Sequence, residues 1–255
     1  MLRDVMLAMA LCAVTTASLA TNTERQVLPE HPSADQKADI ERRLNDWPQL
    51  ERYARENEAY PAGKPGEKRV VFMGDSITDG WGRQVGEFFP GKGYINRGIS
   101  GQTTPQMLVR FRADVIALKP AVVVILAGTN DIAGNTGPSS VQMIEDNLMS
   151  MAELARAHGI RVVIANLLPI SNYHDATSST RRPPADIKTL NAWIRDYTTR
   201  EHLGYIDYFD AMLDKTGQLR ADLSDDGLHP NAKGYKVMAP LAQKAIDAAL
   251  VDTTS

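Results

Sequence analysis

Short apolar runs divide the chain from residue 70 onward into strand-like segments. Each run is rich in apolar residues and stops at glycine, proline or a polar turn, which is typical of strands buried in a sheet. The run at 121–127 is nearly continuous, as expected for a parallel sheet that is covered on both faces. The expected strands are residues 70–73, 94–96, 121–127, 160–167 and 204–207.

Cap and breaker residues place helices between these strands. Thr103 or Thr104 with Pro105 gives the cap and first position of one helix, and Gly159 gives the C-terminal cap of the next. This alternation predicts an α/β fold: a three-layer α/β/α sandwich with a flavodoxin-like five-stranded parallel sheet and right-handed crossovers. The expected helices are residues 104–118, 139–158, 185–202 and 232–250.

The segment before the first strand has a helical pattern of its own. Apolar residues recur at three- and four-residue spacings from residue 34 to residue 60, and Pro48 should kink or split that helix. We favour a helix packed on the outside of the domain over a separate binding module. The expected organisation is a signal peptide at 1–20, a linker at 21–33, a helical extension at 34–66 and one α/β domain at 67–251.

The first twenty residues resemble an export signal. Arg3 precedes a short apolar run, and small residues at Ser18 and Ala20 fit signal-peptidase cleavage after Ala20. Cys12 follows Leu11 rather than a small residue, so we do not expect a lipid anchor. The predicted location is periplasmic or secreted, and the mature chain would lack cysteine. An uncleaved anchor or a cytosolic amphipathic start is the alternative.

Composition limits the classes of partner. The 255 residues are 43% hydrophobic and 23% charged, which suits one large globular domain. The net charge of -3 comes without a basic block, so neither nucleic acid nor a polybasic membrane contact is indicated.

The end of the first strand carries the first candidate for chemistry. Gly74 stops the strand, and Ser76 follows at the carboxyl edge of the sheet, where open α/β folds build their sites. The G-x-S-x-G elbow of another hydrolase fold is not matched, because Thr78 stands at its last position. Alone, Ser76 could equally be an ordinary helix cap.

Four polar blocks occur along the chain: Gly74-Asp75-Ser76, Asn96-Arg97-Gly98, Gly128-Thr129-Asn130-Asp131 and Asp226-Gly227-Leu228-His229-Pro230. In this order they resemble the SGNH/GDSL hydrolases, and the chain is similar to bacterial esterases of that family related to platelet-activating-factor acetylhydrolase and lysophospholipase-like enzymes. The resemblance extends from Val70 to Leu241, with Ile77 where the family has leucine. It implies a serine carboxylic-ester hydrolase, for which we expect neither a cofactor nor a metal.

Acyl-transfer chemistry suggests a role for each block. A serine hydroxyl needs a neighbouring base, and His229, in a Gly/Pro turn before the last helix, is the best candidate for activating Ser76. Asp226 can orient that imidazole. Alternatively, Asp225 or a backbone carbonyl could orient His229 in place of Asp226.

The resemblance also assigns donors to the oxyanion formed during the reaction. These are the backbone N–H groups of Ser76 and Gly98 and the side-chain amide of Asn130. Asn130 could instead merely cap its turn. We interpret Asp75 and Asp131 as supports of their loops rather than as metal ligands.

The substrate is expected to be a small ester with a short, acetyl-type acyl group. It would be an acetylated carbohydrate or, alternatively, a lysolipid, and Tyr173 and His174 in the long loop 170–185 are candidate substrate contacts, with Arg181 and Arg182 nearby. Another possibility is a non-catalytic carbohydrate-binding relative. A nucleotide binder is not indicated, because neither glycine-rich phosphate motif follows the first strand.

Overall fold

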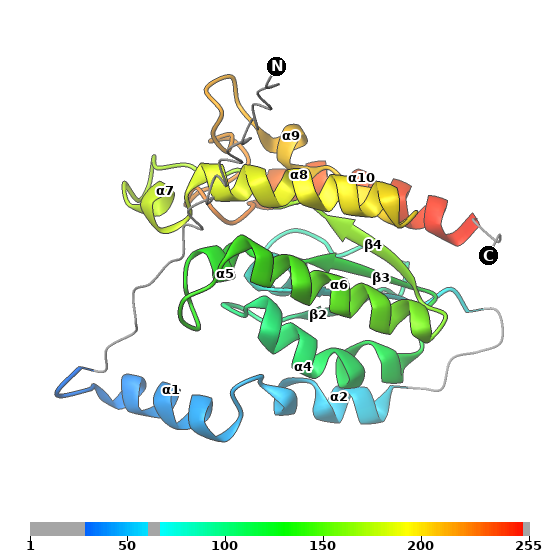
Figure 1. Ribbon diagram of the computed structural model, residues 1–255, viewed down its shortest axis with the longest axis horizontal. Helices are drawn as coiled ribbons and strands as arrows, with labels where there is room; N and C mark the ends of the chain where they lie inside the picture. Colours follow the sequence, from blue (N-terminus) through cyan, green and yellow to red (C-terminus); the bar gives the residue numbers. More distant parts are fainter. Residues whose placement is uncertain (1–28, 61–66, 252–255) are drawn as a thin grey trace, which may run out of the picture.

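A five-stranded parallel sheet forms the centre of the molecule (Figure 1). The computed structural model describes residues 29–60 and 67–251. The strands lie in the order β2-β1-β3-β4-β5, and every neighbouring pair is parallel. The expected fold class is therefore confirmed. The strands are β1 (Val70–Gly74), β2 (Ile95–Gly98), β3 (Val122–Leu126), β4 (Arg161–Ala165) and β5 (Gly204–Ile206).

Helices cover both faces of this sheet. α4, α6 and α8 pack side by side in one layer, and α10 packs on β3, β4 and β5 in the other (Figure 1). The main helices are α4 (Thr104–Asp114), α6 (Val141–Ala157), α8 (Pro184–Arg200) and α10 (Ala232–Val251). Shorter ones are α3 (Ser76–Gly80), η2 (Ile116–Leu118), α5 (Thr129–Ile132), α7 (Ser178–Arg181) and α9 (Tyr208–Met212).

The core explains the apolar runs of the central strands. Every residue of β1 and β3 is buried, because each of these strands has a neighbour on both sides and helices on both faces. Val71 and Ile125 are completely inaccessible to solvent. An apolar residue is thus required at each successive position, rather than at alternate ones.

The N-terminal extension is divided, as Pro48 predicted. It consists of α1 (Ala34–Asn45), η1 (Leu50–Arg52) and α2 (Ala54–Ala59), and the Asp46 carboxylate accepts from the N–H groups of Leu50 and Glu51 in the break. All residues of α1 are at least partly exposed, whereas α2 lies along α4 (Figure 1).

The expected signal peptide, residues 1–20, lies outside the described residues, as does most of the expected linker, so the proposed division into four regions stays a prediction. Within 29–60 and 67–251, no helix is both long and apolar enough to cross a bilayer.

Candidate active site

Ser76 occupies the turn between β1 and α3. The Asp75 side chain caps α3 by accepting from the Ile77 N–H at 3.0 Å, which leaves the Ser76 N–H at the first helical position without an intrahelical partner. Gly74 is required in this turn, because a Cβ there would lie 2.1 Å from Thr78 Oγ1. The sequence thus fixes a half-buried serine at the start of a helix.

His229 and Asp226 complete a hydrogen-bonded series with this serine. Ser76 Oγ lies 2.9 Å from His229 Nε2, and His229 Nδ1 lies 2.6 Å from Asp226 Oδ2. Because a carboxylate can only accept, the Nδ1 atom carries the proton and Nε2 is free to accept from the serine. The alternative orienter, Asp225, instead accepts from Asn231 at 3.0 Å.

The Asp226 carboxylate is held in its charged form. Desolvation favours a higher pKa, but hydrogen bonds from the His229 ring, the His229 N–H and the Leu228 N–H outweigh it and lower the pKa of Asp226 to about 2. The two backbone N–H groups lie 2.7 and 2.8 Å from Asp226 Oδ1. The Ser224 hydroxyl also donates to Oδ1, at 3.2 Å. An anion that is fixed by four donors is suited to stabilise a protonated imidazole beside it.

Asn130 reaches the same place from the end of β3. Gly128 adopts a φ of 126°, which turns the chain into α5 and places Asn130 in the cavity wall. One hydrogen of its Nδ2 atom is donated to the Gln102 carbonyl oxygen at 3.0 Å. Because an amide nitrogen carries two hydrogens, the second is available to a ligand.

The structure corrects the role expected of Gly98. Its N–H donates to Asn96 Oδ1 at 2.9 Å, and the residue is buried. Glycine is needed there for packing, because a Cβ would lie 2.1 Å from the backbone nitrogen of Asp79 in α3. Gly98 is not among the described residues that line the cavity containing Ser76 and His229.

Gly101 takes the position that was expected of Gly98. It lines the cavity with Ser76 and Asn130, its φ is +79°, and its N–H has no hydrogen-bond acceptor within 29–60 and 67–251. Sequence reasoning named Gly98 as a donor and did not name Gly101, whose N–H is the one available at the cavity.

The cavity beside the serine has a volume of about 390 Å³. Residues from six separate segments form its wall. They are Ser76, Gly80, Gln84, Val85, Ser100, Gly101, Asn130, Arg182, Leu228, His229, Pro230 and Tyr235. Three of the four polar blocks therefore meet at this cavity, through Ser76, Asn130 and His229, whereas Asn96-Arg97-Gly98 is not among the described residues of its wall.

Tyr173 and His174, the expected substrate contacts, lie outside the cavity wall. Both are exposed, and neither is among the described residues of the cavity wall. The Tyr173 hydroxyl donates to the Ser224 carbonyl at 2.7 Å, so this side chain fastens the 170–185 loop to the loop that carries Asp226. Arg182, from the same loop, lines the cavity instead.

Asp131 supports its loop, as expected, and Asp79, outside the four blocks, forms an ion pair. Asp131 accepts from the Thr104 N–H at 3.0 Å and from its hydroxyl at 2.5 Å, which joins α5 to the start of α4. Asp79 pairs with Arg83 at 2.6 Å. Within the described chain, no group of three His, Cys, Asp or Glu side chains is arranged to hold a metal ion.

Burial affects the two innermost carboxyls. Desolvation raises the pKa of Asp75 to about 6 and that of Asp131 to about 6, despite the hydrogen bonds that each accepts. Asp75 Oδ2 has no hydrogen-bond partner among the described residues.

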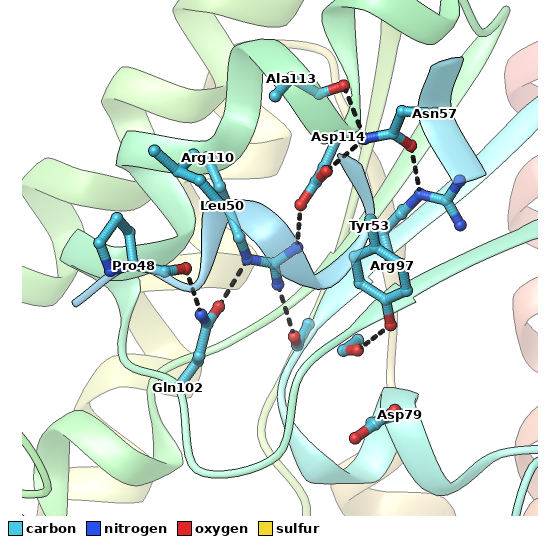
Figure 2. Close-up of polar contacts among 12 residues, drawn as sticks. Pro48, Leu50, Tyr53, Asn57, Asp79, Arg97, Gln102, Arg110, Ala113 and Asp114 are labelled. Atoms are coloured by element: carbon cyan, nitrogen blue, oxygen red, sulfur yellow. Dashed lines mark hydrogen bonds and ion pairs between the residues drawn. The ribbon is translucent and has the colours of Figure 1, made fainter. Parts of the chain in front are cut away.

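The N-terminal segment, residues 46–60, buttresses the loop that carries Gly101. Figure 2 shows Gln102 between two elements: its Nε2 donates to the Pro48 carbonyl at 2.7 Å, and its Oε1 accepts from Arg110 Nε at 2.5 Å. The buried Arg110 guanidinium also donates to the Gly74 carbonyl at 3.1 Å and to Asp114 at 2.9 Å. Gln102 thus connects the extension with the end of β1.

Tyr53 makes a second connection (Figure 2). Its side chain is 1% exposed, and its hydroxyl donates to the Gly98 carbonyl while accepting from Arg83 at 2.5 Å. The Arg97 guanidinium stacks on the ring at 4.5 Å from its centroid. Asn57 adds a bond to Asp114 at 2.6 Å. The hydrogen-bonded partners lie 30 to 57 residues apart in the chain, and sequence reasoning missed these contacts.

A serine, an imidazole and a carboxylate in hydrogen-bonded series, beside amide donors at the edge of a parallel sheet, define the class of α/β hydrolytic enzymes that use a serine. A family model described as the GDSL-like lipase/acylhydrolase family matches residues 72–237. The chain belongs to this family of carboxylic-ester hydrolases.

Individual proteins are similar to this chain. A solved structure of a GDSL-like lipase from Bacteroides thetaiotaomicron has a TM-score of 0.75 and 42% identity, and the match covers 80% of this chain and 100% of the other. Esterase TesA of Pseudomonas aeruginosa is 28% identical over 173 residues, 63% of this chain and 79% of that protein. An acetylxylan esterase of Xylanibacter ruminicola is 26% identical over 225 residues, 73% of this chain and 44% of that protein.

Proposed function

We propose that this protein is an exported serine esterase that removes short, acetyl-type acyl groups through an acyl-enzyme on Ser76. The observation that carries the proposal is the hydrogen-bonded series from Ser76 Oγ through His229 to Asp226, which opens on a cavity also lined by Asn130 and Gly101. This order of groups is what an acyl transfer to serine requires.

In the proposed reaction, Ser76 Oγ attacks the ester carbonyl carbon while its proton passes to His229 Nε2. The carbonyl oxygen becomes an oxyanion, which accepts from the Ser76 N–H, the Gly101 N–H and the Asn130 amide. Collapse of this intermediate breaks the bond to the alcohol oxygen, which takes the proton from His229. A water molecule, deprotonated by the same imidazole, then hydrolyses the acyl-enzyme and restores the Ser76 hydroxyl.

The wall of the cavity favours a substrate with a short acyl group. Tyr235 of α10 forms part of the wall, and the Trp81 ring stacks on it with the centroids 4.9 Å apart. The Tyr235 hydroxyl donates to the Ile77 carbonyl at 2.8 Å. Acetylated carbohydrate is the substrate class that we favour, because a relative is named an acetylxylan esterase. Export rests on the pattern of residues 1–20.

A lysolipid acyl hydrolase is the second candidate, and one observation favours it. A larger hollow of about 630 Å³ lies on the other side of Tyr235, between residues 86–92 and α10. Phe89, Ala239 and Pro240 give it apolar wall. If Tyr235 moved aside, an acyl chain could extend from the first cavity into the second.

An acyl-length series tests both candidates. Rates on p-nitrophenyl esters from acetate to dodecanoate should fall steeply beyond butyrate for the favoured function, and rise with length for the lipid alternative. Ser76→Ala should lower kcat by at least about 1,000-fold on every ester. Unchanged turnover in Ser76→Ala would remove the serine mechanism, and inactivity of the native protein on every ester would favour a carbohydrate-binding role.

A further inference from the structure

Arg182 presents an unpaired, buried positive charge to the catalytic cavity. The residue is 7% exposed and lines the same cavity as Ser76 and His229. Its Nε atom is inaccessible and has no hydrogen-bond partner among the described residues. It is also the only lysine or arginine among the described residues that line this cavity.

An arginine in this state is unusual, because burying a charge without a partner is costly. Burial lowers the pKa of Arg182, and repulsion from Arg181 lowers it further. Attraction to three more distant carboxylates acts in the opposite direction; these are Asp75, Asp175 and Asp226. Within the described chain, none of these carboxylates is close enough to form an ion pair with it. Asp175 is paired with Arg181 instead. The guanidinium therefore keeps its capacity to bind a ligand.

The backbone around Arg182 is fixed, so the side chain is presented from a firm support. Its N–H donates to the Ser178 carbonyl at 2.9 Å at the end of α7. The loop that carries it is fastened to the Asp226–His229 loop, because the Ser171 N–H donates to the Gly227 carbonyl at 2.9 Å.

This attachment places Arg182 on the histidine side of the cavity. Gly101 and Asn130, the proposed donors to the oxyanion, come from the ends of β2 and β3. In the proposed reaction His229 protonates the departing alcohol oxygen, so the part of the substrate on the histidine side is the alcohol. A guanidinium binds carboxylate or phosphate oxygens in preference to neutral groups.

We propose that Arg182 is a specificity residue that binds an anionic group, a carboxylate or a phosphate, on the alcohol part of the ester. The proposal rests on the proposed function, since it assigns the alcohol to the histidine side of an esterase site. A sugar acid would supply the carboxylate, and a lysophospholipid headgroup would supply the phosphate.

A pair of nearly isosteric esters tests the charge. 4-Acetoxybenzoate and 4-acetoxybenzamide release acetate from similar phenols, and only the first carries a carboxylate on the alcohol part. We expect the wild-type protein to have a higher kcat/KM on the benzoate, and Arg182→Gln to reduce the benzoate-to-benzamide ratio by about 10- to 100-fold, as for loss of a charge-assisted hydrogen bond. Arg182→Lys should retain part of the ratio.

Arg181→Gln is the matched control. Arg181 is adjacent and equally charged but exposed, so its loss should leave the ratio within twofold. Equal loss of both activities in Arg182→Gln would overturn the proposal, because Arg182 would then only support Asp75 and the fold. The proposal also fails if the wild-type protein does not favour the benzoate.

A second pair of substrates distinguishes the sources of the anion. 4-Acetoxyphenyl phosphate, compared with phenyl acetate, reports a phosphate preference, and acetylated glucuronate, compared with acetylated glucose, reports a carboxylate preference. An Arg182-dependent gain on either pair supports the proposal and identifies the source, whereas no gain on either contradicts it. Failure of the esterase function would appear separately, as hydrolysis that survives Ser76→Ala.

Discussion

The side-chain nitrogen of Asn130 lies 3.0 Å from the carbonyl oxygen of Gln102. This bond connects the two segments that line the oxyanion side of the cavity, the start of α5 and the turn that contains Gly101. The bond fixes the orientation of the Asn130 amide, so its second hydrogen points in one direction. Donors that are preorganised in this way are the most effective in acyl transfer.

Replacing Asn130 should therefore reduce the rate far more than substrate binding. We expect Asn130→Ala to lower kcat on p-nitrophenyl acetate by about 100- to 1,000-fold with little change in KM. Asn130→Asp, which keeps the shape but lacks the donor, should be at least as impaired. Activity within fivefold of wild type in a folded Asn130→Ala protein would show that the amide is not an oxyanion donor.

Two adjacent aspartates provide a test of the orienting residue. Asp226 accepts from His229 Nδ1, whereas Asp225 accepts from Asn231. Asp226→Asn should lower kcat by up to about 10,000-fold, because an amide in this position favours the wrong tautomer of the imidazole. Asp225→Asn is the matched control and should keep near-normal activity. Similar losses in the two variants would argue against the assignment.

The depressed pKa of Asp226 predicts how the site responds to acid. Its folded pKa of about 2 lies below its ordinary value of 3.8, so its contribution to stability is present above about pH 4 and is lost as the pH falls toward 2. Protonation of Asp226 should therefore not reduce the activity between pH 8 and pH 5. A pH–rate profile in Asp226→Asn and wild type, with unfolding measured alongside, checks this expectation.

Asp75 should have the opposite effect on stability. Burial raises its folded pKa to about 6 from 3.8, so its contribution to the free energy of unfolding is greatest below about pH 4 and is lost as the pH rises through 6. Two pKa units correspond to about 3 kcal/mol. Asp75→Asn retains an acceptor for the Ile77 N–H and removes the charge. Denaturant unfolding at pH 4 and pH 7 should show a smaller difference in this variant, reduced but not abolished because Asp131 acts in the same direction.

Tyr53 links the extension to β2, and its hydroxyl should matter to both stability and rate. Tyr53→Phe leaves the Gly98 carbonyl without this donor, which we expect to cost about 1–3 kcal/mol of unfolding free energy. A several-fold fall in kcat at unchanged KM is expected as well, because the turn containing Gly101 follows Gly98 directly. Tyr94→Phe is the control, since Tyr94 bonds to Gln243 and neither residue is among the described residues that line the cavity containing Ser76. Equal effects of the two substitutions would contradict this role.

The architecture and half of the site could be predicted from sequence, for a common reason. Buried parallel strands need continuous apolar residues, and parallel strands bring their carboxyl ends to one edge, so Ser76, Asn130 and His229 had to lie near one another. Other features depend on side-chain directions. The sequence of residues 96–101 does not reveal that the Asn96 side chain accepts a hydrogen bond from the Gly98 N–H.

The same limit applies to the 170–185 loop. Its composition indicated a role at the cavity, but whether Tyr173 or Arg182 faces inward depends on how α7 ends. The contacts of Tyr53 were unpredictable in another sense, because its hydrogen bond to Gly98 spans 45 positions of the chain and neither partner carries a local signal of it.

The dependence of Gln102 on the Pro48 carbonyl has a practical consequence for anyone who expresses or redesigns this enzyme. The match to the family model begins at residue 72, and a gene trimmed to that boundary would remove Tyr53 and leave two guanidinium groups, those of Arg83 and Arg97, without the aromatic ring on which they stack. We therefore expect the shortest stable form of this hydrolase to begin near residue 46, upstream of every block that identifies the family.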